Sequence, residues 1–223
     1  MGNESFSVIG KRQPMIDGLV KASGDAKYVA DLVLPRMLTG KMLRSPYPHA
    51  RVLHVDAGEA LALRGVKAVV TGGDIRGKKY GIFKSRRDEP GITHKARSIG
   101  DPVAAVAAVD EETAAEALEL IRVDYEELPA LFDPEDAMKE GAPLIHDEYE
   151  RNIVAYRKFN FGDIEAGFKA SDHIREDHFY SQGVSHGNPE PRGTLAQFDQ
   201  SGNLTLWTST QSPYLVRRDL SLA

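Results

Sequence analysis

The chain has 223 residues, of which 41% are hydrophobic and 27% charged, close to the averages for soluble globular domains. Its formal charge of -5 gives no general attraction to nucleic acid or to an anionic membrane, so the sequence predicts neither partner. The absence of cysteine excludes disulfides and thiolate ligands, and no apolar run is long enough to cross a bilayer. Because the N-terminus lacks the features of a secretory signal, we expect a cytoplasmic protein.

The first part of the chain predicts strands with a helix packed on them. Residues 1–25 have few apolar residues at a regular period and are expected to form an extended arm. Alternating or apolar runs predict strands over 37–45, 51–56 and 65–74. Asp56 can cap a short helix between the second and third of these strands. This order favours a mixed sheet with a helix on one face.

The stretch "DPVAAVAAVDEETAAEALELIRVDYEEL" is the clearest structural signal. Residues 102–109 are an apolar run suited to a buried strand, and Asp110 is a typical N-cap, followed by two glutamates in the first turn. Apolar residues then recur at helical spacing, at Ala114, Ala117, Leu118 and Ile121. Small alanines on the strand and on the helix predict close packing of the helix on the sheet. A strand that returns along the sheet is expected to begin at Val123.

The second part of the chain has weaker patterns. Residues 128–160 contain prolines and acids without a regular period, which predicts a connector with a domain boundary near residue 145. A short helix is expected over 161–172 and a strand over 173–183.

Residues 193–210 predict a hairpin whose turn uses Gly202 at positive φ. The helix that follows has the apolar residues Leu215, Leu220 and Leu222 but no Gly or Asn stop signal, so we expect it to be interrupted.

Most candidate motifs for chemistry fail on spacing. His173 and His178 lie five residues apart on an expected strand and would point to opposite faces, so the histidines do not predict a metal site. "GGDIRGKK" matches the frame of a phosphate-binding loop at Gly72, Gly77 and Lys78, but Lys79 replaces the required Ser or Thr and no helix follows.

Other local signals are equally weak. The basic stretch "KKYGIFKSRRDEP" could contact an anion, although a solvated loop is the simpler interpretation. Ser185 and His186 have no oriented base and no nucleophile elbow, which leaves hydrolase chemistry unsupported. Neighbouring acids such as Glu126 and Glu127 are expected on the surface.

"SHGNPEPRG" and "STQSP" form the remaining pointer to a site. Glu190 lies between two prolines and therefore has a rigid backbone. Ser209, Thr210 and Gln211 end a strand, where polar groups often contact a ligand because the strand holds them in place. A structural turn is an equally good interpretation of these residues.

Several long strings resemble one enzyme family. "GDAKYVADLVLPRMLTGKMLRSPYPHARVLHVD", "RGVKAVVTGGD", "IGDPVAAVAAVDEETAAEALELIRVDYEELPALFDPEDA" and "LTLWTSTQSP" are similar to the N-terminal part of the molybdenum-binding large subunit of the xanthine dehydrogenase and aldehyde oxidase family. The resemblance spans nearly the whole chain in order. The N-terminal arm and "KYGIFKSRRDEP" are most similar to the 4-hydroxybenzoyl-CoA reductase branch.

The resemblance implies an α/β (α+β) fold with a mixed sheet. Its expected parts are an N-terminal arm over 1–20, an α/β hammerhead domain over 21–130, a linker over 131–150 and the truncated beginning of a molybdopterin-binding domain over 151–223. It also implies a molybdenum pyranopterin cofactor, often the cytosine dinucleotide form in bacteria, in the complete subunit. Iron-sulfur clusters and FAD would lie on partner subunits, and the substrate would be an aromatic or aldehyde small molecule.

For individual residues, the resemblance matches Gln211 to a glutamine beside the molybdenum centre. Glu190 and Pro191 match a motif that precedes the strands lining the pocket, whereas Arg192 replaces the histidine or alanine usual in the family. The family's glycine-rich loop and catalytic glutamate are absent from this sequence. We therefore expect a fragment or one part of a split subunit, with no catalytic or metal-ligating residue of its own.

Two hypotheses remain beside the molybdenum hydroxylase. One is a non-catalytic assembly module that docks redox subunits on the hammerhead fold. The other is an anion or nucleotide binder that uses residues 72–79.

Overall fold

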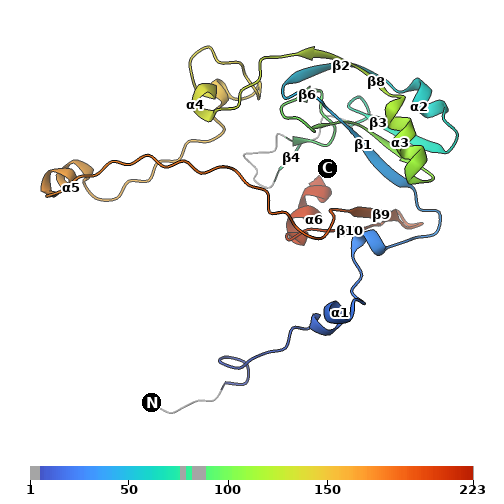
Figure 1. Ribbon diagram of the computed structural model, residues 1–223, viewed down its shortest axis with the longest axis horizontal. Helices are drawn as coiled ribbons and strands as arrows, with labels where there is room; N and C mark the ends of the chain where they lie inside the picture. Colours follow the sequence, from blue (N-terminus) through green and yellow to red (C-terminus); the bar gives the residue numbers. More distant parts are fainter. Residues whose placement is uncertain (1–5, 76–78, 82–88, 223) are drawn as a thin grey trace. The chain divides into compact units, whose positions relative to one another are not determined.

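The computed structural model describes residues 6–75, 79–81 and 89–222 (Figure 1). Contacts between residues divide the chain into two units. The larger unit comprises Arg36–Ser181 and Ser212–Ala223. The smaller unit comprises Met1–Pro35 and Gln182–Gln211. No helix in the described part of the chain has both the length and the apolar content needed to cross a membrane.

The larger unit contains a three-stranded sheet in the order β1 (Thr39–Arg44), β7 (Pro102–Ala108) and β3 (Val66–Thr71), with antiparallel pairing at both ladders. The central strand β7 carries the apolar run and is almost fully buried. Val103 and Val106 are among its buried side chains, because β7 has a neighbour on each edge and a helix packed against it.

Helix α3 (Glu111–Glu119) covers this sheet (Figure 1). The Asp110 carboxylate caps it by accepting a hydrogen bond from the Thr113 N–H at 2.8 Å. Ala114 and Ala117 are fully buried in one core with Ala104, Val106 and Ala108 of β7. The predicted cap, helix and close alanine packing are therefore confirmed.

A second three-stranded sheet has the order β6 (Lys95–Ala96), β2 (Ala50–Asp56) and β8 (Arg122–Glu127). Its ladders are also antiparallel. The strands were expected to form a mixed sheet; instead, those in the described part of the chain form separate antiparallel sheets. The difference arises because pairing joins segments such as β2 and β8, which lie far apart in the sequence, and no local pattern encodes that choice.

Short elements connect the strands of the larger unit. Helix α2 (Gly58–Ala62) follows β2, and its N-cap is Ala57 rather than the expected Asp56. The Asp56 carboxylate accepts the Gly58 N–H at 2.9 Å from the position before the cap. Strands β4 (Lys79–Tyr80) and β5 (Glu89–Pro90) pair with each other.

The segment after β8 contains α4 (Pro134–Ala137), a 3-10 turn over Glu150–Asn152 and α5 (Ile164–Ala170). Asp133 caps α4 and Asp163 caps α5. The strand predicted over 173–183 is wrong, because these residues form no regular element. An extended segment becomes a strand only when a neighbour satisfies its backbone groups, and none of the described segments pairs with it.

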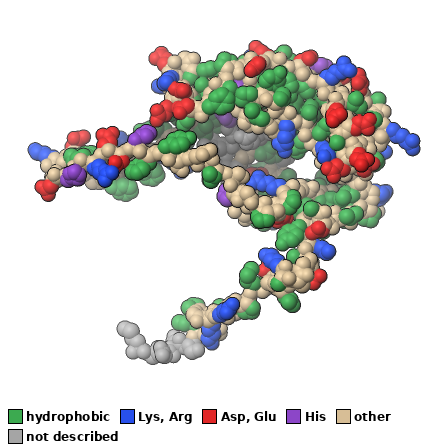
Figure 2. Space-filling view, viewed as in Figure 1, with side chains coloured by type: hydrophobic (Ala, Val, Ile, Leu, Met, Phe, Trp, Pro, Cys, Tyr) green, Lys and Arg blue, Asp and Glu red, His purple; other side chains and the backbone are tan. Residues whose placement is uncertain are grey.

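Apolar side chains are exposed on the segments that lead to and from α5, beside charged ones (Figure 2). Tyr156, Phe161 and Phe179 are 84%, 86% and 87% exposed. Aromatic side chains with such exposure are typical of a surface that another protein segment covers. Helix α6 (Pro213–Leu222) also belongs to this unit, and its Tyr214 is exposed.

The smaller unit contains the hairpin of β9 (Thr194–Phe198) and β10 (Leu204–Thr208), which pair antiparallel. Gly202 has φ 82° in its turn, as predicted. The Asp199 carboxylate accepts the N–H groups of Ser201 and Asn203 at 2.8 and 2.9 Å, which closes the turn.

The same unit holds α1 (Gly18–Ser23) and a 3-10 turn over Val29–Asp31. The sequence predicts an arm without regular structure over 1–25, and the short α1 corrects that prediction. A helix of six residues carries too few apolar positions to give a visible period.

Candidate functional site

A cavity of about 490 Å³ lies at the end of β10 in the smaller unit. Residues from two stretches about twenty positions apart line it: His186, Asn188, Glu190, Arg192, Ser209, Thr210 and Gln211. These side chains are half-buried or exposed, so the cavity is open to solvent. The structure thus brings together the two stretches, "SHGNPEPRG" and "STQSP", that the sequence indicates as a weak pointer.

Ser209 fixes the geometry of the cavity wall. Its hydroxyl oxygen accepts a hydrogen bond from the Gly193 N–H at 2.9 Å, and its backbone N–H donates to the Gly193 carbonyl at 3.1 Å. A Cβ on Gly193 would lie 3.1 Å from Cγ1 of Val29, so a larger residue would crowd this contact. The residues on either side, Arg192 and Thr210, are therefore attached to a backbone that is held at one point.

Several of the lining side chains carry N–H donors. Asn188 and Gln211 offer amide N–H groups and Arg192 offers a guanidinium. The Ser209 hydroxyl instead donates to the Gly193 carbonyl at 3.3 Å. Glu190 is the acid among the lining residues. Such a set suits a polar ligand with several acceptor atoms.

Potential metal ligands do not cluster in the described part of the chain. Among the described residues, no group of three or more His, Cys, Asp or Glu side chains could hold a metal ion. His173 and His178 lie in the irregular segment after α5, and His186 lines the cavity.

In the candidate phosphate-binding loop, packing explains why the first glycine, Gly72, is a glycine. A Cβ on Gly72 would lie 2.5 Å from Cε1 of the His94 ring, so Gly72 leaves room for that ring. Gly77, Lys78 and the basic stretch over 82–88 lie outside the described residues. Glu126, expected on the surface, pairs with Arg51 of the neighbouring strand at 3.1 Å.

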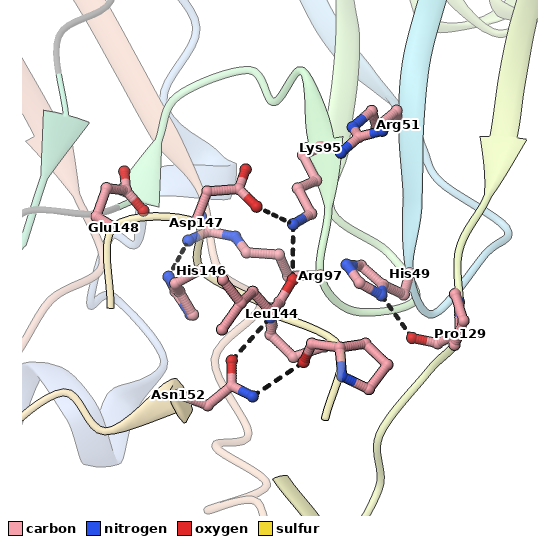
Figure 3. Close-up of polar contacts among 12 residues, drawn as sticks. His49, Arg51, Lys95, Arg97, Pro129, Leu144, His146, Asp147, Glu148 and Asn152 are labelled. Atoms are coloured by element: carbon pink, nitrogen blue, oxygen red, sulfur yellow. Dashed lines mark hydrogen bonds and ion pairs between the residues drawn. The ribbon is translucent and has the colours of Figure 1, made fainter. Parts of the chain in front are cut away.

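A second polar cluster joins the connector to β6 (Figure 3). The Lys95 ammonium donates to the Leu144 carbonyl at 2.8 Å and to the Asp147 carboxylate at 2.7 Å. The hydrogen bond from Lys95 lowers the pKa of Asp147 below its ordinary value. Asn152 closes the connector on itself by accepting the Ile145 N–H at 2.8 Å. We call Lys95, Leu144 and Asp147 the connector clasp.

His49 lies beside this cluster and is 2% exposed (Figure 3). Its Nδ1 is 2.7 Å from the Pro129 carbonyl, and a carbonyl can only accept, so Nδ1 carries the proton. Its Nε2 is buried without a hydrogen-bond partner in the described part of the chain. His49 therefore holds the end of β8 to the start of β2, which is a structural role.

Comparisons with known proteins identify the fold. Residues 23–129 match the family model of the aldehyde oxidase and xanthine dehydrogenase a/b hammerhead domain, and residues 145–223 match that of the molybdopterin cofactor-binding domain. The chain belongs to the aldehyde oxidase and xanthine dehydrogenase family. The α/β fold class, with a hammerhead domain followed by the start of a molybdopterin-binding domain, is thereby confirmed.

Similar family members include parts of molybdenum enzymes. The chain is 37% identical over 223 residues to the nicotinate dehydrogenase large molybdopterin subunit of Eubacterium barkeri, covering 99% of this chain and 51% of that protein. It is 30% identical over 213 residues to the xanthine dehydrogenase molybdenum-binding subunit of Escherichia coli O157:H7, covering 91% of this chain and 28% of the relative.

A solved structure in the same family is similar throughout the chain. The crystal structure of quinoline 2-oxidoreductase from Pseudomonas putida 86 matches with a TM-score of 0.81 and 33% identity, covering 93% of this chain and 27% of that chain. The present chain thus spans about half, or less, of the relatives it matches.

Proposed function

We propose that this hammerhead-family chain forms one wall of the molybdopterin site of a molybdenum-dependent oxidoreductase and is inactive alone. The observation that carries this proposal is the donor-rich cavity at the end of β10, which lies inside the stretch that matches a molybdopterin cofactor-binding domain. Gln211, the residue singled out by resemblance, lines that cavity.

The residues present fit an organic cofactor better than a bare metal ion. A pyranopterin carries ring nitrogens, a carbonyl and phosphate oxygens, which accept hydrogen bonds from amide, hydroxyl and guanidinium groups. A molybdenum pyranopterin, in the cytosine dinucleotide form or without the nucleotide, would supply the two-electron oxidation or reduction of the substrate. Gln211 and Asn188 would hold and orient the cofactor through their amide groups.

The substrate class and partners are part of the same proposal. The relatives are named for nicotinate, xanthine and quinoline, which support an aromatic heterocycle as substrate more than a 4-hydroxybenzoyl thioester. We propose that the exposed aromatic side chains beside α5 pack against the remainder of the molybdenum subunit. Iron-sulfur and flavin subunits would accept the electrons.

The claim of inactivity alone is tested on the purified chain. We expect molybdenum well below one atom per chain by elemental analysis, and no turnover of nicotinate with an artificial electron acceptor. A chain that purified with one molybdenum atom and turned over substrate would contradict this part of the proposal.

The role of Gln211 is tested in the enzyme assembled with its partner polypeptides. We expect Gln211→Ala to lower the molybdenum and pterin content per assembled enzyme at least several-fold. Gln197→Ala is the matched control, because Gln197 is an exposed glutamine of β9 that does not line the cavity. Equal cofactor content in both variants would exclude Gln211 as a cofactor contact.

A further inference from the structure

Arg192 places a positive charge at the cavity wall. The structure gives it no hydrogen bond or ion pair with any described residue, although Glu190 lines the same cavity. A guanidinium keeps its charge at every accessible pH and offers a planar fork of donors. A fork of this kind, without a partner among the described residues, is suited to a carboxylate or phosphate group.

The backbone that carries Arg192 is positioned rather than loose. Pro191 restricts the chain before it, and Ser209 holds the N–H and carbonyl of Gly193 after it. Glu190 lines the same cavity two residues before Arg192. Gln211, whose side-chain amide can donate, lines the same cavity.

We infer that Arg192 binds an oxyanion at this cavity, and that the oxyanion is the carboxylate of an aromatic substrate or a phosphate of the cofactor. The inference rests on the proposed function, because only that function places substrate and cofactor near these residues. Bidentate pairing of the guanidinium with two oxygens supplies both affinity and orientation. The neighbouring Glu190 opposes a second negative group, which favours a ligand with one anionic end.

The test follows backbone amide signals of the full 223-residue chain by NMR during titration with benzoate, its neutral analogue benzamide, and inorganic phosphate. We expect one of the two anions to shift the signals of Gly193 and Ser209, and benzamide to leave them in place. Arg192→Gln should weaken that anion at least about tenfold, the loss expected for a charge-assisted hydrogen bond. Arg192→Lys should retain part of the affinity.

Arg64→Gln is the matched control, because Arg64 is exposed in the turn after α2 and lies outside the cavity lining. Benzoate binding assigns the site to a substrate carboxylate, and phosphate binding without benzoate binding assigns it to the cofactor. Shifts that persist in Arg192→Gln, or no shifts with either anion, would overturn the inference. The cofactor content of Gln211→Ala is measured separately, so failure here is distinguishable from failure of the proposed function.

Discussion

Single glycines show how space, and not only chemistry, constrains this sequence. Gly65 has φ 106°, which side chains with a Cβ rarely adopt, and its carbonyl accepts the Val109 N–H at 3.0 Å. A Cβ there would also lie 3.0 Å from Cγ2 of Thr113. Gly72 is also constrained by space, because a Cβ there would clash with the His94 ring. This packing explains a glycine that the sequence pattern associates with a phosphate-binding loop.

Gly65→Ala should therefore destabilise the fold by about 1–3 kcal/mol, through backbone strain and crowding. Gly40→Ala is the control, since a Cβ at Gly40 would meet its nearest atom, the Val106 carbonyl oxygen, only at 3.9 Å. We expect Gly40→Ala to change the free energy of unfolding by less than about 1 kcal/mol. Urea denaturation of both variants checks this, and equal stabilities would show that Gly65 is not strained.

At the scale of elements, α3 illustrates how a cap and an apolar face together define a helix. Asp110 begins it, and Ala114 and Ala117 place it against β7. The hydrogen bonds from Thr113 lower the pKa of Asp110. Because the folded-state pKa lies below the unfolded value, the carboxylate stabilises the fold above the ordinary pKa of 3.8, and this contribution is lost as the pH falls through the folded-state pKa.

We expect Asp110→Ala to lower the midpoint of thermal unfolding at pH 7, because the cap is lost. Asp110→Asn keeps a capping side chain and should lower it less. The difference between wild type and Asp110→Asn should shrink when unfolding is followed from about pH 7 down to about pH 3. A difference that stayed constant over this range would mean that ionisation of Asp110 contributes nothing.

The cavity at the end of β10 could not be derived from single elements of the sequence. The hairpin of β9 and β10 is visible in the sequence, and so is the polar run that ends at Gln211. Their meeting with Asn188 and Arg192 depends on the contact between Ser209 and Gly193. The hydroxyl of Ser209 gives no signal in the sequence that distinguishes it from other strand-end serines.

For the molecule as a whole, the connector after β8 is held to β6 within the larger unit. In the connector clasp, the side chain of Lys95 is only 15% exposed, while that of Asp147 is 65% exposed (Figure 3). An exposed ion pair contributes little, but the Leu144 carbonyl adds a hydrogen bond to the same ammonium. The linker expected over 131–150 is thus held to β6 in this part of its length.

Lys95→Met should release residues 144–147, and we expect proteolytic cleavage in this segment to become several-fold faster. Lys67→Met is the control, because Lys67 is exposed on β3 and has no hydrogen bond or ion pair with the described residues. Mass spectrometry of the early fragments identifies the cleavage site. Unchanged cleavage in Lys95→Met would show that the clasp does not restrain the connector.

The order of residues is enough to place most elements, the cap at Asp110 and the turn at Gly202, and to indicate the family. These features depend on neighbours within a few residues, where periodicity and side-chain chemistry act directly. The folded chain is needed to show that the described strands form antiparallel sheets, that residues 173–183 are not a strand, and that Arg192 shares a cavity with Gln211. Backbone pairing and side-chain convergence join positions far apart in the chain, and the packing of the whole fold selects those partners.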